Sequence, residues 1–501
     1  MSLHAQLSPE ALARLHAQRR NSTISSLVIA FLVIVLIGLI FGFVLLPNLI
    51  KETPTIVTYQ ASLTEDNKIE EKKMNNQVQR KPSAPSSSMA KVIASNTASP
   101  TAVPVPEVDV PEPSTDFGDG DDFGDGWGSG GDGGGGGGFA NIPAEMRKRC
   151  SPEDRMARLL ETGGVKECED AVVKALDWLK STQNPDGSWT NQNQTAMTGL
   201  ALLAYLGHCE TPLSEKYGDT VLKAMTYLVN IGLKNNGKLT TNAADKHWPY
   251  EHSIATYAIA ESATFCKQLK INVPNLMEVT QQAGQFIIDN QHKSGGWDYS
   301  YAEDGDRGGD LSIAAWHMQA LKACKHTGLD FRNLQRCANR GVAYIVGLQN
   351  SNGGFGYANK NGPAGDTGYF TLTGAGMLSL QMWGKGAQST VRNGAKYLEK
   401  NSKFDYNTEF ADLYGHYYEA QAMMNRGGEQ WKWYNNLFRD QLLKNQNPDG
   451  SWKSPGGGKP LRAVGGSFAG GSPMAVHYRT CLNTLMLEVY YRFLPGTGSA
   501  K

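Results

Sequence analysis

The chain has 501 residues, and its 48 Lys and Arg residues balance its 48 Asp and Glu residues, so the formal net charge at pH 7 is +0. This balance provides no basic surface for nucleic acid, and we expect no nucleic-acid partner. Only 19% of the residues are charged, and the 56 glycines gather in particular segments. The chain therefore divides into sections of different composition.

Residues 25–47 contain an uncharged apolar run from Leu27 to Leu46. A helix of that length, at about 1.5 Å per residue, spans the hydrocarbon core of a bilayer. Three arginines precede the run, which predicts that residues 1–24 are a cytoplasmic tail. A cleaved signal peptide is the alternative, but its apolar region is shorter, about 7–15 residues, and ends at small residues. We expect a single-pass signal anchor in the inner membrane and a carboxyl-terminal domain outside the cytoplasm.

The composition of residues 48–144 predicts a disordered tether, whose first part is rich in Ser and Pro and whose second part is rich in Asp and Gly. They offer few bulky apolar side chains to bury, and a run of six glycines at 133–138 is flexible. The motif DFGDG occurs twice, at 116–120 and 122–126. Calcium binding is an alternative role for this part, although the spacing matches no binding loop that we can justify; the aspartates concerned are Asp116, Asp119, Asp121, Asp122 and Asp125.

The seven cysteines form no CxxC pair and show no zinc-ligand spacing. Most lie among apolar residues at helical positions, which predicts buried thiols. Their spacing assigns no disulfide, and the odd number leaves at least one thiol unpaired in a monomer.

The sequence QNPDGSW occurs at 183–189 and again at 446–452, with looser copies at 291–297 and 349–355. The copies share a glutamine, a glycine four residues later and an aromatic residue two beyond it. Glycine allows positive φ in the turn, and the aromatic ring can cover the end of the preceding helix and the glutamine side chain. We interpret these positions as a structural repeat: Gln183, Gly187, Trp189, Gln291, Gly295, Trp297, Gln349, Gly353, Phe355, Gln446, Gly450 and Trp452.

A helical half-repeat precedes each turn, and two further copies keep only this half. The six copies start at 174, 223, 282, 340, 393 and 437, a period near 50 that indicates a repeat architecture. Each is followed by a more apolar segment, which predicts an outer and an inner ring of helices. The expected inner helices are 195–207, 252–265, 310–324, 368–384, 409–424 and 476–494.

The pattern basic–small–x–x–aromatic–aliphatic–x–x–x–Gln–x–x–x–Gly–x–Trp resembles the repeat of squalene and oxidosqualene cyclases, and more widely that of terpenoid cyclases and protein prenyltransferases. The resemblance covers about residues 170–494. It implies an all-α fold, an α/α toroid of about six helix pairs spanning residues 145–495. It also implies an apolar or polyprenyl-like ligand, although one fold hosts many functions.

Cyclases of the squalene type protonate a polyene with an Asp-x-Asp-Asp motif. That pattern occurs here at 119–122, outside every repeat, and the nearest approach in the domain, Asp304-Gly305-Asp306-Arg307, lacks the final acid. Prenyltransferases hold zinc with Asp, Cys and His, whereas Cys324 and His326 face different sides of a helix. The Gly-Cys-Gly-Glu-Gln run of the related thioester domains does not occur. We therefore expect neither cyclisation by that acid motif nor a metal site, and the sequence indicates no cofactor.

In an α/α toroid the starts of the inner helices converge at one mouth, where this chain is rich in acidic, histidine and aromatic residues. The candidate catalytic residues are Asp306, Asp310, His252 and Asp412. The candidate ligand-binding residues are Trp248, Tyr250, Trp297, Tyr299, His477 and Arg479. The acids have an alternative role as helix caps. The histidines have an alternative role as residues that are simply hydrogen-bonded at the start of a helix. The spacing of Glu409, Asp412 and His416 is typical of one helical face and leaves a metal or acid–base stripe open, without a fourth ligand.

Two kinds of function remain open at this point. A membrane-tethered toroid that has lost the cyclase acid motif would bind an apolar ligand or act as a scaffold. The alternative is an enzyme that uses the mouth residues, either a divergent terpenoid-cyclase-like lyase or transferase or a carbohydrate-active barrel, because aromatic rings beside carboxylates also suit sugars.

Overall fold

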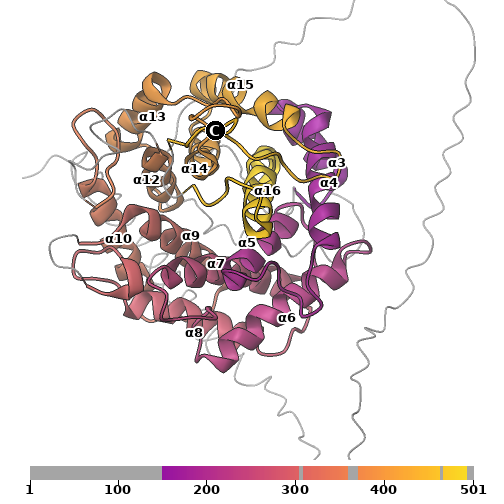
Figure 1. Cartoon of the computed structure of the whole chain (residues 1–501). Helices are drawn as coiled ribbons and strands as arrows, with labels where there is room; N and C mark the ends of the chain where they lie inside the picture. The colour runs from indigo at the N-terminus through magenta and orange to yellow at the C-terminus, as the bar shows by residue number, and fades with distance from the viewer. Residues whose placement is uncertain (1–148, 304–307, 359–370, 463–465, 493–501) are drawn as a thin grey trace, which may run out of the picture. The chain divides into compact units, whose positions relative to one another are not determined.

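The computed structural model describes residues 149–303, 308–358, 371–462 and 466–492 (Figure 1). The predicted tail, anchor and tether lie outside these residues, as do Asp304, Asp306 and the acidic pattern at 119–122. Within the four ranges, no helix has both the length and the apolarity needed to cross a membrane. The anchor at 25–47 stays a prediction.

The described residues form helices and no strand, apart from two isolated β-bridges within repeat turns. The all-α expectation is therefore confirmed for this part of the chain. The helices are α3 Pro152–Glu161, α4 Lys166–Ser181, α5 Gln194–Gly207, α6 Gly218–Lys234, α7 Trp248–Leu269, α8 Leu276–Asp289, α9 Leu311–Thr327, α10 Leu334–Gly347, α12 Thr371–Met382, α13 Ser389–Asn401, α14 Leu413–Arg426, α15 Gly428–Lys444, α16 Pro473–Leu487 and α17 Val489–Arg492, with the short 3₁₀ helix η2 at Tyr299–Tyr301.

The helices are arranged as two concentric rings (Figure 1). In the inner ring α5, α7, α9, α12, α14 and α16 each contact the next, and α16 returns to α5. The outer helices α4, α6, α8, α10, α13 and α15 pack behind them, and α15 contacts α4. Inner helices are buried on nearly every side, whereas outer helices bury one stripe, as α9 and α10 illustrate. This is the helix arrangement expected for an α/α toroid.

The bounds of several inner helices differ from those expected. Helix α7, expected at 252–265, runs from Trp248 to Leu269, four residues further at each end. Residues 409–412 are not helical, because the Asp412 side chain accepts a hydrogen bond from the Gly415 amide (3.1 Å) and so caps a helix that begins at Leu413. Glu409 therefore does not lie in a first helical turn. The segment expected at 476–494 begins earlier, after the cap Ser472, and its helix is divided at Glu488 into α16 and α17.

Each repeat glutamine joins its own turn to the next outer helix. Its Nε2 donates to the carbonyl of the glycine four residues later and to a carbonyl of that helix, at 2.7–3.1 Å. The second acceptors, from Gln183 to Gln446, are Thr220, Cys337, Thr390 and Ala171. The last pair, Gln446 to Ala171, joins the final turn to α4 and closes the outer ring.

The glycines and tryptophans of the repeat have equally regular contacts. The glycines at 187, 295, 353 and 450 have φ between +93° and +98°, and a Cβ there would lie 2.1–2.5 Å from a carbonyl oxygen of the next outer helix. The tryptophan Nε1 donates to the carbonyl ten residues earlier, at the end of the preceding helix: Trp189 to Leu179, Trp297 to Ile287 and Trp452 to Leu442, at 2.8–2.9 Å. Turn, helix end and neighbouring helix are thus fixed together.

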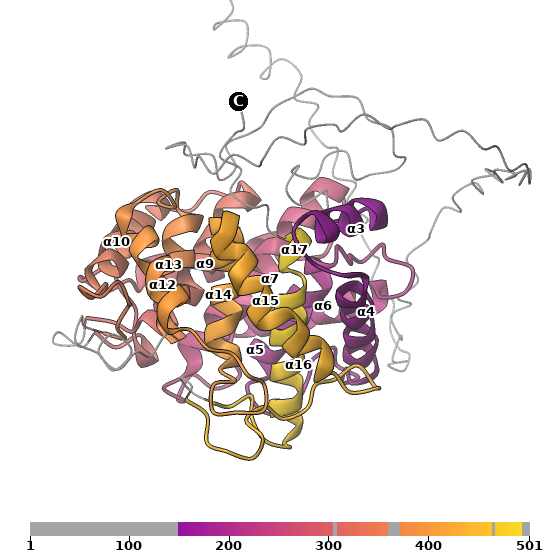
Figure 2. The same cartoon turned by 90° about the horizontal axis from the view of Figure 1, so that it is seen from above.

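The segment that begins at Arg149 is fastened to the end of the ring where the inner helices finish. A disulfide joins Cys150 to Cys209, just beyond α5. Arg149 is buried, and its Nη2 lies 2.5 Å from Oε1 of Glu261 on α7. Helix α3 then contacts α17 at the same end (Figure 2). The other cysteines among the described residues are buried thiols, as expected for most of them.

Candidate functional site

The starts of the inner helices meet at the opposite end of the ring. There Asp310 is fully buried and caps α9: its Oδ1 accepts from the Ser312 amide (2.8 Å) and from the Ser312 hydroxyl. Tyr250, on α7, donates its hydroxyl proton to the Ser312 Oγ, 2.6 Å away. The Tyr414 hydroxyl, on α14, donates to the Ser312 carbonyl at 3.0 Å. Asp310 thus positions a serine that two tyrosines contact.

The two candidate histidines are bonded to the backbone. In His252, Nδ1 accepts from the Leu239 amide (3.0 Å) and Nε2 donates to the Ala283 carbonyl (3.1 Å). His477 Nε2 donates to the Met197 carbonyl at 2.9 Å. Burial lowers the pKa of His252 to about 3 and that of His477 to about 4, so both imidazoles are neutral at pH 7. These contacts fit histidines that stabilise the fold by hydrogen bonds better than they fit catalytic histidines.

The other candidates at the mouth have distinct positions. Arg479 donates to carbonyls of the loop before its own helix, those of Trp452 (2.7 Å) and Gly470 (2.6 Å). Trp297 is buried as part of a repeat turn, stacked on His317. Trp248 is buried against Tyr301, whereas Tyr299 is half-buried and packs against Tyr250. Of these side chains, Tyr250 and Tyr299 extend furthest toward solvent. The candidate Asp306 lies outside the described residues.

Glu409, Asp412 and His416 do not form the metal or acid–base stripe that their spacing left open. The Asp412 carboxyl faces α12, where the Thr371 hydroxyl donates to it, while His416 faces α15 through Tyr434 Oη (2.8 Å). Glu409 lies outside the helix. Across the described ranges, no group of three or more His, Cys, Asp or Glu side chains is placed to hold a metal ion. Asp412 and His416 therefore act on different neighbours.

Four tyrosines lie at the mouth: Tyr250, Tyr414 and Tyr478 belong to inner helices α7, α14 and α16, and Tyr357 follows the repeat turn at 349–355. We call these four the mouth tyrosines. Tyr250, Tyr357 and Tyr478 are half-buried, and Tyr414 is buried beneath them. Their hydroxyls are close enough to interact electrostatically: Tyr414 with Tyr357 and Tyr478, and Tyr250 with Tyr414. Beneath them Tyr418 packs against Tyr414, with ring centroids 5.3 Å apart. These tyrosines therefore contribute neutral aromatic surface at the end of the ring where Asp310 and Asp412 cap their helices.

Side chains from inner helices that are not neighbours meet inside the ring. Trp316 on α9 stacks on Tyr417 of α14, with centroids 5.2 Å apart and planes at 20°, although α12 separates these helices in the ring. Trp316 also meets Tyr418 edge-on at 5.6 Å. All three are almost fully buried. Among the mouth tyrosines and the buried rings below them, only Tyr250 was a candidate from the sequence. The signal that could have identified others is the spacing of Tyr414, Tyr417, Tyr418 and Gln421 on one apolar helix.

Two buried acids near the mouth hold their protons unusually tightly. Burial raises the pKa of Asp412 to about 7, against the hydrogen bond from Thr371 and those from backbone amides. Burial likewise raises the pKa of Glu251, at the start of α7, to about 7. Asp412 is fully buried and Glu251 is 6% exposed. Both carboxyls can therefore be protonated near neutral pH, as a general acid must be.

Glu488 has the same property at the opposite end, and it supports a pH-dependent prediction. Burial raises the pKa of Glu488 to about 8, although Arg492 lies 3.6 Å away. Its folded pKa exceeds the unfolded value, so its charge destabilises the fold increasingly as pH rises from about 5 to 8. We expect Glu488→Gln to match the parent at pH 5 and to be more stable by at least about 2 kcal/mol at pH 8.5. Urea unfolding at both pH values checks this, and equal stability differences at the two would contradict it.

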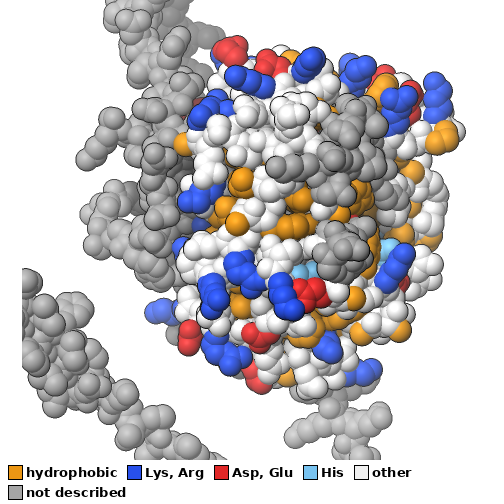
Figure 3. All heavy atoms as spheres, turned by 90° about the vertical axis from the view of Figure 1, so that its left-hand side faces the viewer, with side chains coloured by type: hydrophobic (Ala, Val, Ile, Leu, Met, Phe, Trp, Pro, Cys, Tyr) orange, Lys and Arg blue, Asp and Glu red, His pale blue; other side chains and the backbone are white. Residues whose placement is uncertain are grey.

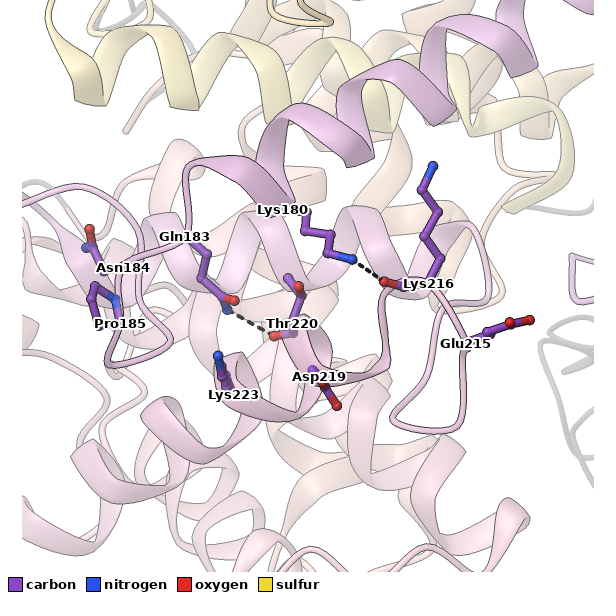
Figure 4. Close-up of a pocket in the computed structure, with 9 residues that line it drawn as sticks. All are labelled: Lys180, Gln183, Asn184, Pro185, Glu215, Lys216, Asp219, Thr220 and Lys223. Carbon is purple, nitrogen blue, oxygen red and sulfur yellow. Dashed lines mark hydrogen bonds between the residues drawn. The ribbon is translucent and has the colours of Figure 1, made fainter. Parts of the chain in front are cut away.

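The outer surface carries a shallow polar groove of about 360 Å³ between the first repeat turn and the start of α6 (Figure 4). Three lysines and two acids line the groove. Its other lining residues include Pro185 of the turn and Gln183, whose side chain donates to the Thr220 carbonyl. Lys180 donates to the Lys216 carbonyl at 2.6 Å. With three lysines beside two acids, the groove is mixed in charge.

The side of the ring seen in Figure 3, which is the left-hand side of Figure 1, shows hydrophobic side chains between charged ones of both signs.

No protein-family model and no curated protein sequence matches the chain. Among solved structures, the type II terpene cyclase MstE from Scytonema is 14% identical, with a TM-score of 0.41, over 65% of this chain and 98% of that one. A variant of the same enzyme in complex with geranylgeranyl dihydroxybenzoate is 14% identical with a TM-score of 0.40, over the same shares of both chains. A protein from Actinoplanes, also 14% identical, has a TM-score of 0.40, over 65% of this chain and 99% of its own.

The resemblance is one of fold. It agrees with the terpenoid-cyclase-like fold that the repeats predict. Likeness at this identity and TM-score carries no information on activity.

Proposed function

We propose that the chain is a membrane-anchored toroid that binds an apolar, polyprenyl-like ligand at the mouth tyrosines, outside the cytoplasm, and that it does so without the acid motif of the cyclases. The observation that supports this most directly is the convergence of half-buried tyrosines from separate inner helices on one end of the ring. Tyrosine offers large apolar contact area with little conformational entropy to lose on binding.

The proposed compartment has two independent supports. The charge distribution around Leu27–Leu46 favours export of everything that follows. The disulfide between Cys150 and Cys209 is of the kind that persists in oxidising compartments and is rare in the cytosol. An anchor joined to the domain by the tether would also keep the domain within reach of lipid, the natural source of a polyprenyl-like molecule.

The test is native mass spectrometry of the full-length protein, purified in detergent and exposed to a total membrane lipid extract. We expect a bound apolar mass, and we expect Tyr250→Ala and Tyr478→Ala each to reduce its occupancy about tenfold, since each removes a large aromatic contact. Trp433→Ala is the matched control, because Trp433 is a half-buried aromatic residue of outer helix α15. An empty ring, or equal losses in all three variants, would contradict the proposal and favour a scaffold for polysaccharide or protein partners.

A second function, acid catalysis, is favoured by one observation: the raised pKa of Asp412 near the mouth. A protonated Asp412 would donate its proton to a bound substrate, as in a divergent terpenoid-cyclase-like enzyme or a carbohydrate-active one. Asp412→Asn keeps a capping oxygen for α14 but removes the acidic proton. Lost turnover of the bound ligand with an unchanged melting temperature would support catalysis, whereas a lower melting temperature alone would indicate a cap.

A further inference from the structure

Four buried side-chain atoms around Tyr417, below the mouth, have no hydrogen-bond partner among the described residues. One is Tyr418 Oη, which can donate or accept. The other three have one fixed role each: Trp316 Nε1 and Gln319 Nε2 donate, and Gln421 Oε1 accepts. The residues that carry them are at most 1% exposed. Because buried polar atoms in native proteins are almost always paired, these three indicate a polar group that is not part of the described chain.

The neighbouring bonds fix which atoms remain available. Tyr417 Oη donates to Gln319 Oε1 at 3.2 Å, so the Gln319 NH₂ group is the unused end of that amide. Gln421 Nε2 donates to the Tyr417 carbonyl at 3.0 Å, so its Oε1 is the unused acceptor. Trp316 stacks on the Tyr417 ring. All three residues therefore border Tyr417, and together they present two N–H donors and one carbonyl acceptor.

That combination matches a hydroxyl group. A hydroxyl oxygen accepts two hydrogen bonds and donates one, so it can satisfy all three atoms at once. A ketone or ether oxygen accepts but cannot donate to Gln421, and a hydrocarbon pairs with none of the three. The three atoms carry no formal charge, and the rings of Trp316, Tyr417 and Tyr418 form the walls around them.

We propose that the ligand of this toroid is an apolar chain that bears a hydroxyl group, and that Trp316, Gln319 and Gln421 bind that hydroxyl. The inference rests on the proposed function and names the chemical class of its ligand. The apolar chain extends from the hydroxyl along Tyr418 and Tyr414 to the mouth tyrosines. In the free protein a water molecule makes the same three bonds and leaves when the alcohol binds.

The experiment compares geranylgeraniol with the hydrocarbon of the same skeleton that lacks the hydroxyl, both titrated into the full-length protein in detergent. We expect the alcohol to bind about tenfold or more tightly. Trp316→Phe removes only the N–H group and keeps the stacked ring, and Gln319→Leu removes the second donor. Each variant should lose most of the preference for the alcohol while its affinity for the hydrocarbon stays within about twofold. Thr256→Val is the control, because Thr256 is a fully buried residue of inner helix α7 whose hydroxyl already donates to the His252 carbonyl.

The outcomes separate the two proposals. If the parent protein binds both molecules equally, or if Trp316→Phe and Gln319→Leu keep the full preference, the hydroxyl site is wrong and apolar binding stands. If neither molecule binds the parent protein, both proposals are wrong. Should Gln319→Leu fail to fold, Trp316→Phe alone decides between these results.

Discussion

Gly450→Ala is expected to lower the free energy of unfolding by about 2–5 kcal/mol. Gly450 has φ of +96°, which disfavours any residue with a Cβ, and that Cβ would lie 2.1 Å from the Lys174 carbonyl oxygen. The substitution therefore strains the turn and also pushes the last repeat away from the first helix of the outer ring. Urea unfolding of the full-length protein, followed by circular dichroism, measures the loss.

Gly458→Ala separates the two causes. Gly458 also has positive φ, +83°, but a Cβ there would meet nothing within 4 Å. We expect this variant to lose about 1–2 kcal/mol of unfolding free energy, the cost of holding a residue with a Cβ at positive φ. If the two alanine variants were equally destabilised, the contact between Gly450 and α4 would not matter to the closure of the ring.

Glu261→Gln is expected to cost about 3–5 kcal/mol of stability at pH 7. The Glu261 carboxylate lies between two buried guanidinium groups, 2.5 Å from Arg149 and 3.0 Å from Arg492. Burial works to raise its pKa, but the two arginines hold the pKa of Glu261 below the usual value. An amide of the same shape would leave both positive charges buried without this carboxylate, and the one acid beside Arg492, Glu488 at 3.6 Å, has its pKa raised to about 8.

The cost should shrink in acid, because a carboxyl with a lowered pKa stabilises the fold fully above its unfolded pKa of 4.5 and loses this effect as pH falls from there through the folded pKa. Unfolding of the variant and the parent at pH 7 and in acid well below pH 4 tests both statements. Glu429→Gln is the control: Glu429 is exposed, its ion pair with Lys432 lies on the surface, and its loss should change stability by less than about 1 kcal/mol. Similar losses at positions 261 and 429 would show that the buried network contributes no more than a surface pair.

The ring could be predicted because its signals are local and repeated. A glutamine and a glycine at positive φ recur at fixed offsets with the same bonds in all four turns, and a tryptophan with the same bond in three of them. The contrast between apolar and mixed helices likewise predicts which ring each helix joins. The start of α14 was missed because Asp412 suits a helical first turn as well as it suits a cap, and only its bond to Gly415 distinguishes them.

The site was harder to predict because burial and partner choice depend on residues distant in sequence. His252 and His477 look reactive in a sequence, yet each is bonded to the backbone of another helix, 31 and 280 positions away. Trp316 and Tyr417 look like ordinary core residues, yet they meet from inner helices that are not neighbours. The disulfide of Cys150 was equally hidden, since its partner is 59 residues along and no spacing motif marks the pair.

The bond from Gln446 to the Ala171 carbonyl spans 275 positions, and it has a consequence for how the protein folds. An open solenoid can stop growing at any repeat, because each unit needs only its neighbour. A closed ring lacks that freedom, because the first outer helix stays without one of its two neighbours until the last turn exists. During synthesis the chain therefore remains an unfinished arc with apolar helix faces exposed until its final repeat has emerged, and closing that arc brings a high contact order that slows folding. The period of greatest exposure to aggregation lies between the first helix pair and the last, and it ends when the ring closes.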